Sequence, residues 1–404
     1  MKKLSYLILL LLLSACGIST EPTPLSDASA MSWEAQLVSA RGKEITLMMW
    51  PGDPLINAYM KSYVKPEVKQ RFGIDLNIVP GQGNQIVSSL MTEMEAGKTS
   101  SEVDMVWING ETFYQLRQIK ALHGPFAKSL PNAEFINWES AFIGTDFQQP
   151  VDGFECPWGN VQMTLIYDSL KVSAPPMTLD ELGIWVKANP GKFTLGNNFT
   201  GMTLLKAWLI DFAGGGKSLN GDFDEAKYLE ASTKLWDFIN THKAYFWNEG
   251  KSFPNDLAEQ HRLFANGELA FTMSNNDSEV DNKIAQGLFP ESARAYVPDY
   301  GSIQNSHYMG ITSLSANKKA VEVVINFLIS PEAQLKKMDP RVWGDGTVLD
   351  VNKLSAEWQQ KFQDVPGRVH APERSEIAEK ALMEPAPEYM MRLFEDFRLK
   401  VIEA

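Results

Sequence analysis

Aromatic, amide and carboxylate side chains repeatedly stand at the ends of the apolar segments of this sequence. Trp50 ends one apolar run, and Asp53 lies in the Pro-Gly-Asp-Pro loop that follows it. Trp107, Asn109 and Glu111 lie at the end of a later run. Further candidates of the same kinds are Trp158, Gln162 and Asn275. Flat rings beside amide and carboxylate groups suit a small polar or cationic organic molecule, so we predict that these residues bind one.

The prediction depends on the recurrence of this pattern rather than on any one residue. Tryptophan is usually mostly buried, so about half of these rings are equally well explained as core. Asp53 and Glu111 favour a ligand with positive charge, because a carboxylate that faces a partly buried cation is strongly stabilised. These loops contain no lysine or arginine, so a bare oxyanion would depend on helix N-termini alone.

The residue patterns of common catalytic sites are missing. The glycine-rich segment 214–218 lacks the first glycine of a phosphate loop, since that position holds Asp211. The five histidines show no metal-ligand spacing, and the sequence has no Gly-x-Ser-x-Gly motif. Cys156 has no neighbouring histidine in the sequence, which favours a packed core residue over a catalytic thiol. We therefore predict no catalytic residue, no metal site and no cofactor.

The candidate residues need strands and helices that bring them together. Three apolar runs predict buried strands, and each is followed by a glycine-bearing loop and a helical pattern. The strands are expected over 44–50, 74–79 and 103–108, and the helices over 55–71, 84–96 and 111–122. Asn84 is expected to be the N-cap of the second helix. This alternation predicts a parallel sheet, in which loops at the carboxyl ends of the strands converge on one site.

The rest of the chain continues the mixed pattern. The alternation lapses over 150–159, which predicts a first crossover between two lobes, and a second crossover is expected between 294–297 and 307–312. Other strands are expected over 161–167, 192–195 and 269–273, and other helices over 179–189, 204–212, 225–240, 257–265, 321–329 and 331–337. The predicted organisation is a signal peptide over 1–15, a tether over 16–42, a first lobe over 43–152 and 301–345, a second lobe over 153–300, and a C-terminal helical segment over 346–404 that packs on the lobes.

The N-terminal segment predicts export and attachment to a membrane. Lys2 and Lys3 precede an apolar run that has signal-peptide length and is shorter than the roughly 20 residues of a spanning helix. Leu-Ser-Ala-Cys16-Gly resembles the lipobox of bacterial lipoproteins, so Cys16 is the expected lipidation site. The alternative is an ordinary secretory signal with an unrelated cysteine. Residues 18–30 are rich in Ser, Thr, Pro and Ala, as in a flexible tether.

Charge and cysteine content exclude several classes of protein. The formal net charge is −13, and it falls to about −15 when Lys2 and Lys3 are removed. An acidic surface argues against nucleic acid as a partner, because phosphate contacts need clustered lysine and arginine. With Cys16 lipidated, Cys156 is the one remaining cysteine, so no disulfide is expected within the chain.

Several phrases of the sequence resemble the extracellular solute-binding proteins of ABC importers. The segments 263–272, with Phe-Ala-Asn-Gly-Glu-Leu-Ala-Phe, and 323–334, with Asn-Phe-Leu-Ile-Ser-Pro-Glu-Ala-Gln, are similar to segments common in that superfamily. The YnjB-like branch is a closer match. Its recurring phrases are similar to those over 50–54, 103–111, 157–162, 247–254 and 339–345. One departure is the lipobox, where a plain cleavable signal is expected in much of this branch.

The resemblance implies the type II periplasmic-binding-protein fold, with two α/β lobes that enclose the ligand in a cleft and close like a hinge. It implies a small-molecule solute and an ABC permease as partners, and a monomeric protein in the periplasm or on the cell surface. Relatives bind thiamine, polyamines, iron or oxyanions, so the solute stays open. Two other functions remain open: an exported hydrolase or transferase with its site in the same cleft, and a lipoprotein that only scaffolds partners.

Overall fold

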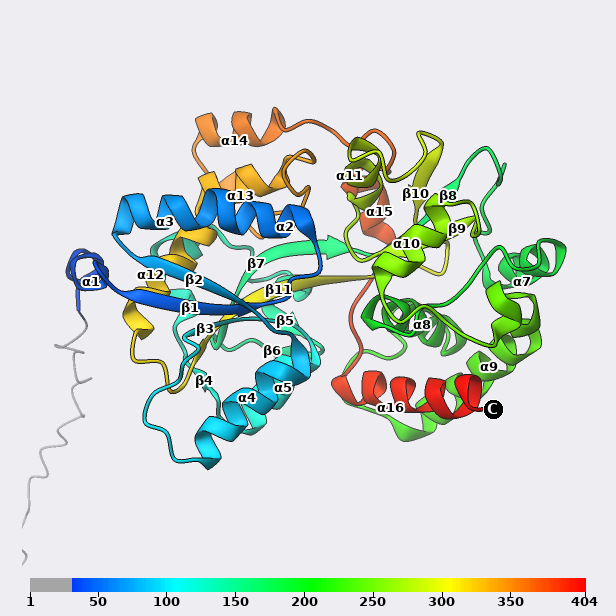
Figure 1. The fold of residues 1–404 in the computed structure, drawn as a ribbon, viewed down its shortest axis with the longest axis horizontal. Helices are drawn as coiled ribbons and strands as arrows, with labels where there is room; N and C mark the ends of the chain where they lie inside the picture. Colours follow the sequence, from blue (N-terminus) through cyan, green and yellow to red (C-terminus); the bar gives the residue numbers. More distant parts are fainter. Residues whose placement is uncertain (1–30) are drawn as a thin grey trace, which may run out of the picture.

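Two sheets, each covered by helices, organise residues 31–404, which are the part of the chain that the computed structural model describes (Figure 1). The two resulting lobes lie side by side. The predicted signal peptide, most of the predicted tether and Cys16 lie outside the described residues. No helix within residues 31–404 combines the length and the apolar character needed to cross a membrane.

The first lobe is built on a mixed sheet with the strand order β12-β11-β3-β1-β2, and β4 and β7 also pair with β11. The strands β1 and β2 are parallel, as are β1 and β3, whereas β11 runs antiparallel to β3. The bounds are β1 Glu44–Met49, β2 Asp75–Pro80, β3 Met105–Ile108, β4 Leu122–His123, β7 Glu155–Gln162, β11 Ser302–Thr312 and β12 Ala381–Leu382. The predicted parallel arrangement of the first three strands is confirmed.

Helices cover both faces of this sheet because its strands are apolar on both sides. Met105 of β3 packs into the core beneath α3 and α12, and Val106 packs on the opposite side with residues of α4 and α5. The helices are α1 Trp33–Ala40, α2 Pro54–Ala58 with the π-helical turn Tyr59–Val64 and α3 Lys65–Phe72, α4 Gly83–Glu95, α5 Glu111–Gln118, α6 Ala141–Gly144, α12 Lys318–Leu328, α13 Pro331–Met338 and α14 Ala356–Gln363. Each fully buried Leu, Ile or Val contributes about 1.5–3 kcal/mol relative to an exposed side chain.

The second lobe is built on a three-stranded antiparallel sheet with the order β10-β8-β9. Its strands are β8 Thr164–Asp168, β9 Phe271–Ser274 and β10 Ala293–Tyr296. Its helices are α7 Leu179–Ala188, α8 Phe199–Phe212, α9 Glu225–His242, α10 Leu257–Ala265, α11 Glu279–Ala285, α15 Arg374–Ile377 and α16 Pro387–Phe397. α8 is buried along most of its length and forms the centre of this lobe's core.

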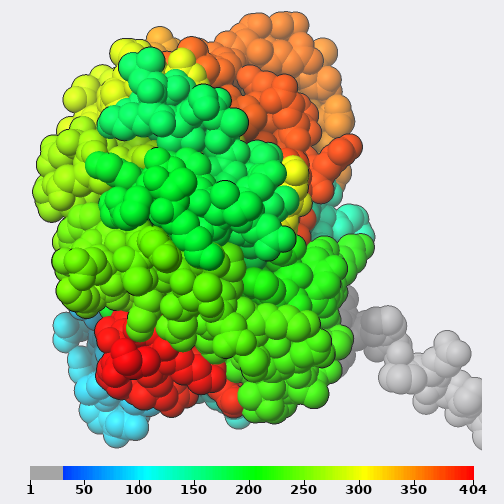
Figure 2. Space-filling view, turned by 90° about the vertical axis from the view of Figure 1, so that its right-hand side faces the viewer, coloured from blue at the N-terminus to red at the C-terminus, as the bar shows by residue number. Residues whose placement is uncertain are grey.

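Within residues 31–404, three connections join the lobes. β7 runs into β8, β10 returns through β11, and a third segment leads from α14 on the first lobe to α15 on the second (Figure 1). The chain then adds β12 to β11 and ends in α16, which is set into the surface of the second lobe (Figure 2). A short hairpin of β5 Thr145–Asp146 and β6 Gln149–Pro150 extends from the first lobe near this crossing.

Several local predictions differ from the structure. Residues 33–40 of the predicted tether form α1, which is held on the first lobe because Gln36 donates to the carbonyl of Lys319 on α12. The helix predicted over 204–212 already begins at Phe199, because Asn198 caps it. The strand predicted over 161–167 is divided between β7, which ends at Gln162, and β8, which begins at Thr164.

The N-cap of α4 is Gln82, not Asn84. The region 150–159 is not free of regular structure, because β7 begins at Glu155 and pairs with β11. α5 ends at Gln118, since the next turn has Lys120 in the left-handed region and Leu122 pairs with β11. No strand forms over 192–195, because its carbonyls accept single bonds from Ala270 and Trp247 rather than a ladder.

Candidate functional site

The carboxyl end of β1 carries Trp50 and Asp53 toward the second lobe. Asp53 is the N-cap of α2, and its Oδ1 accepts hydrogen bonds from the backbone N–H groups of Leu55 and Ile56 at 2.8 and 2.9 Å. Trp50 is 37% exposed, and its ring lies over Gly52, where a Cβ atom would come within 2.2 Å of the ring. Only glycine therefore lets this ring fold back over its own loop.

A cluster of charged side chains connects this loop with α11. Nζ of Lys283 lies 3.8 Å from Oδ2 of Asp53 and 3.0 Å from Oε1 of Glu279. Burial and the nearby Glu279 raise the pKa of Asp53, although Lys283 and the two backbone donors oppose the shift. Burial lowers the pKa of His261, which lies 3.9 Å from Glu279, to about 4, so this imidazole is neutral at pH 7. The loop after β1 is thus in ion-pair range of the second lobe.

The carboxyl end of β3 forms a tight turn that leads into α5. Gly110 has φ +60°, and a Cβ there would lie 2.4 Å from the ring of Phe147, so glycine is required. The backbone N–H of Gly110 donates to Oδ2 of Asp146 at 2.6 Å. Asn109 is half-buried before this turn, and Glu111 is half-buried after it as the first residue of α5. The turn therefore holds the Glu111 side chain at the edge of the first lobe.

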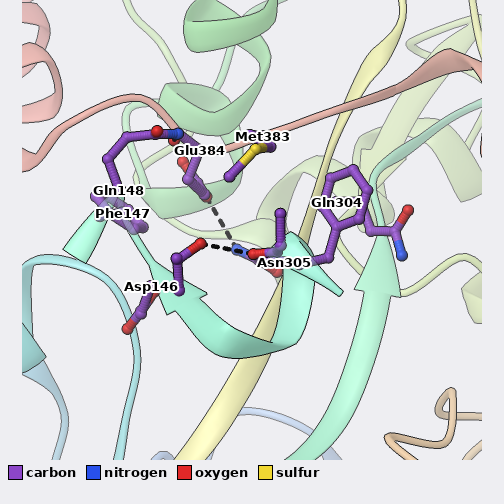
Figure 3. A pocket seen from close by; sticks show the side chains of 10 residues that line it. Asp146, Phe147, Gln148, Gln304, Asn305, Met383 and Glu384 are labelled. Carbon is purple, nitrogen blue, oxygen red and sulfur yellow. Dashed lines mark hydrogen bonds between the residues drawn. The ribbon is translucent and has the colours of Figure 1, made fainter. Parts of the chain in front are cut away.

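Two charged side chains of opposite sign, Lys206 and Glu384, act on Glu111. Burial raises the pKa of Glu111, the positive charge of Lys206 on α8 lowers it, and the negative charge of Glu384 raises it again. Lys206 is fully buried and forms its ion pair with Oε2 of Glu384. Asn305 of β11 donates Nδ2 to the other oxygen of Glu384 at 2.9 Å (Figure 3). These charges come from both lobes and from the C-terminal segment.

A small pocket opens beside this group. It is lined by Ala141, Phe142, Thr145, Asp146, Phe147, Gln148, Gln304, Asn305, Met383 and Glu384 (Figure 3). Burial raises the pKa of Asp146 to about 8, so at pH 7 this carboxyl group is mostly protonated and adds little charge. Glu155, on the neighbouring β7, is also fully buried, and burial raises its pKa well above the usual range.

Trp107 and Trp158 meet in one aromatic cluster. Their ring centroids are 5.0 Å apart in an edge-to-face arrangement, and His307 and Trp343 complete the cluster. Trp107 is half-buried, whereas Trp158 is fully buried. The Trp158 ring therefore supports the cluster from inside the first lobe instead of presenting a face to the cleft.

The remaining predicted residues lie at the connections. Gln162 is buried near the end of β7 and donates Nε2 to Oγ of Ser302 and to the carbonyl of Ile377, which ties two connections together. Asn275 follows β9 and donates to Oγ1 of Thr200 near the start of α8. Gln162 has its amide nitrogen fully engaged, while Asn275 is half-buried on the side of the second lobe that carries the α8 N-terminus.

The structure adds residues that the sequence patterns did not select. These are Phe199, Lys206, Lys283, His307, Trp343 and Glu384. Lys206 had one usable signal, because it interrupts an otherwise apolar helical stretch. No sequence signal pointed to Glu384, because its partner Lys206 is 178 positions away in the chain. Among residues 31–404, no group of three or more His, Cys, Asp or Glu side chains is arranged to hold a metal ion.

Comparison with known proteins agrees with this architecture. Residues 56–364 match the family described as bacterial extracellular solute-binding protein. Protein YnjB of Escherichia coli K12 is 34% identical over 338 residues, which cover 83% of this chain and 87% of that protein.

Solved structures with low sequence identity share the fold. The spermidine/putrescine ABC transporter substrate-binding protein PotD from Streptococcus pneumoniae has a TM-score of 0.60 at 16% identity, covering 89% of this chain and 99% of its own. The periplasmic binding protein AfuA from Actinobacillus pleuropneumoniae has a TM-score of 0.62 at 10% identity, covering 90% and 100%. The predicted two-lobe periplasmic-binding-protein fold is confirmed, and this chain belongs to the bacterial extracellular solute-binding protein family.

Proposed function

We propose that this protein captures a small polar or cationic organic solute in the cleft between its lobes and delivers it to the permease of an ABC importer. The loops after β1 and β3 form the site on the first lobe, and the N-terminus of α8 with the loop after β9 forms it on the second. Loops at the carboxyl ends of parallel strands are the usual ligand sites of open α/β sheets. No bond of the solute is made or broken.

The observation that carries this proposal is the contact of Asp53 with Lys283 at 3.8 Å. It supports an interlobe site because the loop after β1 and α11 approach each other there. Trp50 is 37% exposed on one lobe and Phe199 is 38% exposed on the other, so each lobe offers an aromatic ring for contact with a ligand. Asn109, Glu111 and Asn275 supply polar groups in this proposal, while Trp107, Trp158 and Gln162 support the loops that bear them.

The names of two structurally similar proteins support the transport role in this proposal. PotD is named for spermidine and putrescine, and the AfuA structure holds fructose-6-phosphate. These solutes differ in charge, so the names alone do not select a ligand for this chain. We further propose that Cys16 carries the lipid that anchors a monomeric protein to a membrane, in the periplasm or at the cell surface.

The test is a thermal-shift screen of amines, vitamins, sugar phosphates and oxyanions, followed by calorimetry. A solute at a hundred times its dissociation constant is expected to stabilise the fold by about 2.7 kcal/mol. Trp50→Ala and Phe199→Ala are each expected to weaken binding of a hit by roughly 1–3 kcal/mol. The matched control is Trp358→Ala on α14, at the outer edge of the first lobe (Figure 1), which should leave the affinity unchanged.

Two results would contradict the proposal. One is a hit whose affinity is the same in both cleft variants and the wild type, which puts the pocket elsewhere. The other is a solute that is chemically converted during incubation, which makes the protein an enzyme.

A further inference from the structure

We propose that Glu384 sets the charge selectivity of the cleft, because it neutralises Lys206 and so leaves the Glu111 carboxylate free for the cationic group of a solute. This inference rests on the proposed solute-binding function. It narrows the ligand class to organic molecules that carry a positive charge.

Lys206 is a fully buried ammonium group that depends on one carboxylate. It lies in the middle of α8, with Nζ 4.6 Å from the ring centroid of Phe147 and 5.4 Å from that of Phe199. Its ion-pair partner is Glu384. An ammonium group removed from water is strongly disfavoured unless a partner compensates its charge, so the two residues function as a pair.

Glu384 is held toward Lys206 from both sides. Asn305 of β11 donates to its Oε1 at 2.9 Å, as Figure 3 shows, and Gln148 of the β5–β6 hairpin donates to its backbone carbonyl at 2.6 Å. The residue is 5% exposed. These bonds fix the carboxylate of Glu384, so it has little freedom to serve a solute directly.

Glu111 differs from Glu384 because its carboxylate is not engaged. The Glu111 carboxylate makes no hydrogen bond or ion pair with another side chain or backbone group of residues 31–404, although the residue is half-buried. Gly110, the residue before Glu111, packs against the ring of Phe147, and the centroid of the same ring lies 4.6 Å from Nζ of Lys206. Lys206 and Glu384 accordingly act on the pKa of Glu111 in opposite directions, so the three groups lie in one electrostatic environment. With two carboxylates and one ammonium group, the trio carries a net charge of about −1, which favours one cationic group in the cleft.

Asp146 does not alter the net charge of this group of side chains at neutral pH. It faces Glu384 and Lys206, but burial raises its pKa to about 8, and its Oδ2 is engaged by the N–H of Gly110. Glu155 behind it is also raised well above its ordinary pKa by burial. The Asp146 carboxyl group is therefore mostly neutral at pH 7.

Glu384, which neutralises the charge of Lys206, lies outside the part of the chain that matches the family. The match ends at residue 364, and Glu384 belongs to the later segment that adds β12 to β11 and ends in α16 (Figure 2). Charge selectivity is thus supplied by a C-terminal segment that crosses between the lobes, in addition to the loops at the strand ends.

The experiment offers the full-length protein three probes: the cation-exchange-bound, neutral and anion-exchange-bound fractions of a bacterial small-molecule extract. Native mass spectrometry reports the adduct, and titration of the fraction reports its apparent affinity. We expect an adduct from the cationic fraction. Glu384→Gln is expected to weaken it at least about tenfold, since the trio then has no net charge. Glu111→Gln should weaken it to a similar extent.

The double variant Lys206→Met with Glu384→Gln is the decisive one. It removes both members of the buried pair and restores the net charge of about −1 through Glu111 alone, so cation binding should return to within about threefold of the wild type. It also covers the case in which Glu384→Gln alone fails to fold. Glu395→Gln, an exposed carboxylate on α16 in the same segment, is the control and should change nothing.

The outcomes distinguish a failure of this inference from a failure of the proposed solute-binding function. An adduct from the neutral or anionic fraction alone overturns the inference but keeps the protein a solute-binding protein. Loss of cation binding in the folded double variant also overturns it, because Glu384 would then act through contact rather than charge. The absence of an adduct from all three fractions counts against the proposed function itself, and the inference falls with it.

Discussion

Replacement of Asp345 tests how the loop that carries Trp343 is held against β11, the strand that carries His307. Asp345 is fully buried, and its Oδ2 lies 2.7 Å from Nζ of Lys337 and 3.0 Å from Nε2 of His307. Lys337 also donates to the backbone carbonyl of Gly346. Asp345→Ala would leave the buried ammonium group of Lys337 without a counter-charge.

The expected loss of stability follows from the burial of both partners. Removal of one member of a buried ion pair costs about 3–5 kcal/mol, because the other charge stays desolvated and unpaired. Unfolding entropy of about 2.1 cal/mol/K per residue converts a loss of about 4 kcal/mol into a decrease in Tm of about 5 °C for a protein of this length. The double variant Lys337→Met with Asp345→Asn should lose much less, since it leaves no unpaired charge.

The sign of the pH dependence is fixed by the direction of the shift. Burial alone would raise the pKa of Asp345, but the charges of His307 and Lys337 outweigh it and lower this pKa below 3.8. A carboxyl group with a lowered pKa in the folded state stabilises the protein above its unfolded pKa, and this contribution disappears as the pH falls through the folded value. The difference in Tm between wild type and Asp345→Ala should therefore persist at pH 5–8 and shrink only below about pH 4.

The assay is thermal unfolding by circular dichroism across that pH range, with Arg341→Gln as the control. Arg341 pairs with Asp339 on the surface, and its side chain is 76% exposed, so the control should leave Tm unchanged. An Asp345→Ala variant that unfolds within 1 °C of the wild type at pH 7 would refute the reasoning. A double variant as unstable as the single one would refute it as well, because the cost would then come from packing and not from charge.

Three further predictions use other parts of the chain. Burial raises the pKa of Asp146 to about 8, so its favourable contribution is present below about pH 4 and lost as the pH rises toward 8; Asp146→Asn should flatten the loss of Tm between pH 5 and 9. Cys16→Ser should move the protein from the membrane fraction to the soluble fraction, and a variant that still carries lipid contradicts the lipobox prediction. Small-angle scattering should show a smaller radius of gyration when a solute that has passed the screen is bound, whereas an unchanged profile at saturation indicates a rigid cleft.

Strands and helices with strong local signals could be predicted from the sequence. β1, β2 and β3 lie within one or two residues of their expected ends, because each is an apolar run closed by proline, glycine or asparagine. The helix over Leu257–Ala265 has its expected bounds, since Asp256 caps its start with a bond to the N–H of Glu259 and Gly267 follows its end. Local capping and hydrophobicity decide such elements without help from the rest of the fold.

Elements that depend on distant partners could not be predicted in the same way. The apolar pattern around Phe193 predicts a strand. Its backbone carbonyls, however, accept hydrogen bonds from two separate segments, at Ala270 and Trp247, so no strand ladder forms. Trp107 and Trp158 carry the same signal, yet one is half-buried and the other is fully buried by His307 and Trp343. Burial of a ring is decided by the tertiary packing around it, which residue type and spacing do not encode.

The same distinction applies to the two carboxylates first selected for a cationic solute. Asp53 and Glu111 both follow strands, but Asp53 uses one oxygen to cap α2 and directs the other toward Lys283. Glu111 keeps its carboxylate free. Glu384 stands near Glu111 but is committed to Lys206, so a solute cation meets one available carboxylate in this group rather than a row of them. The position of Glu111 follows from the general geometry of parallel sheets, whereas its availability follows from a pair of residues that only the folded chain brings together.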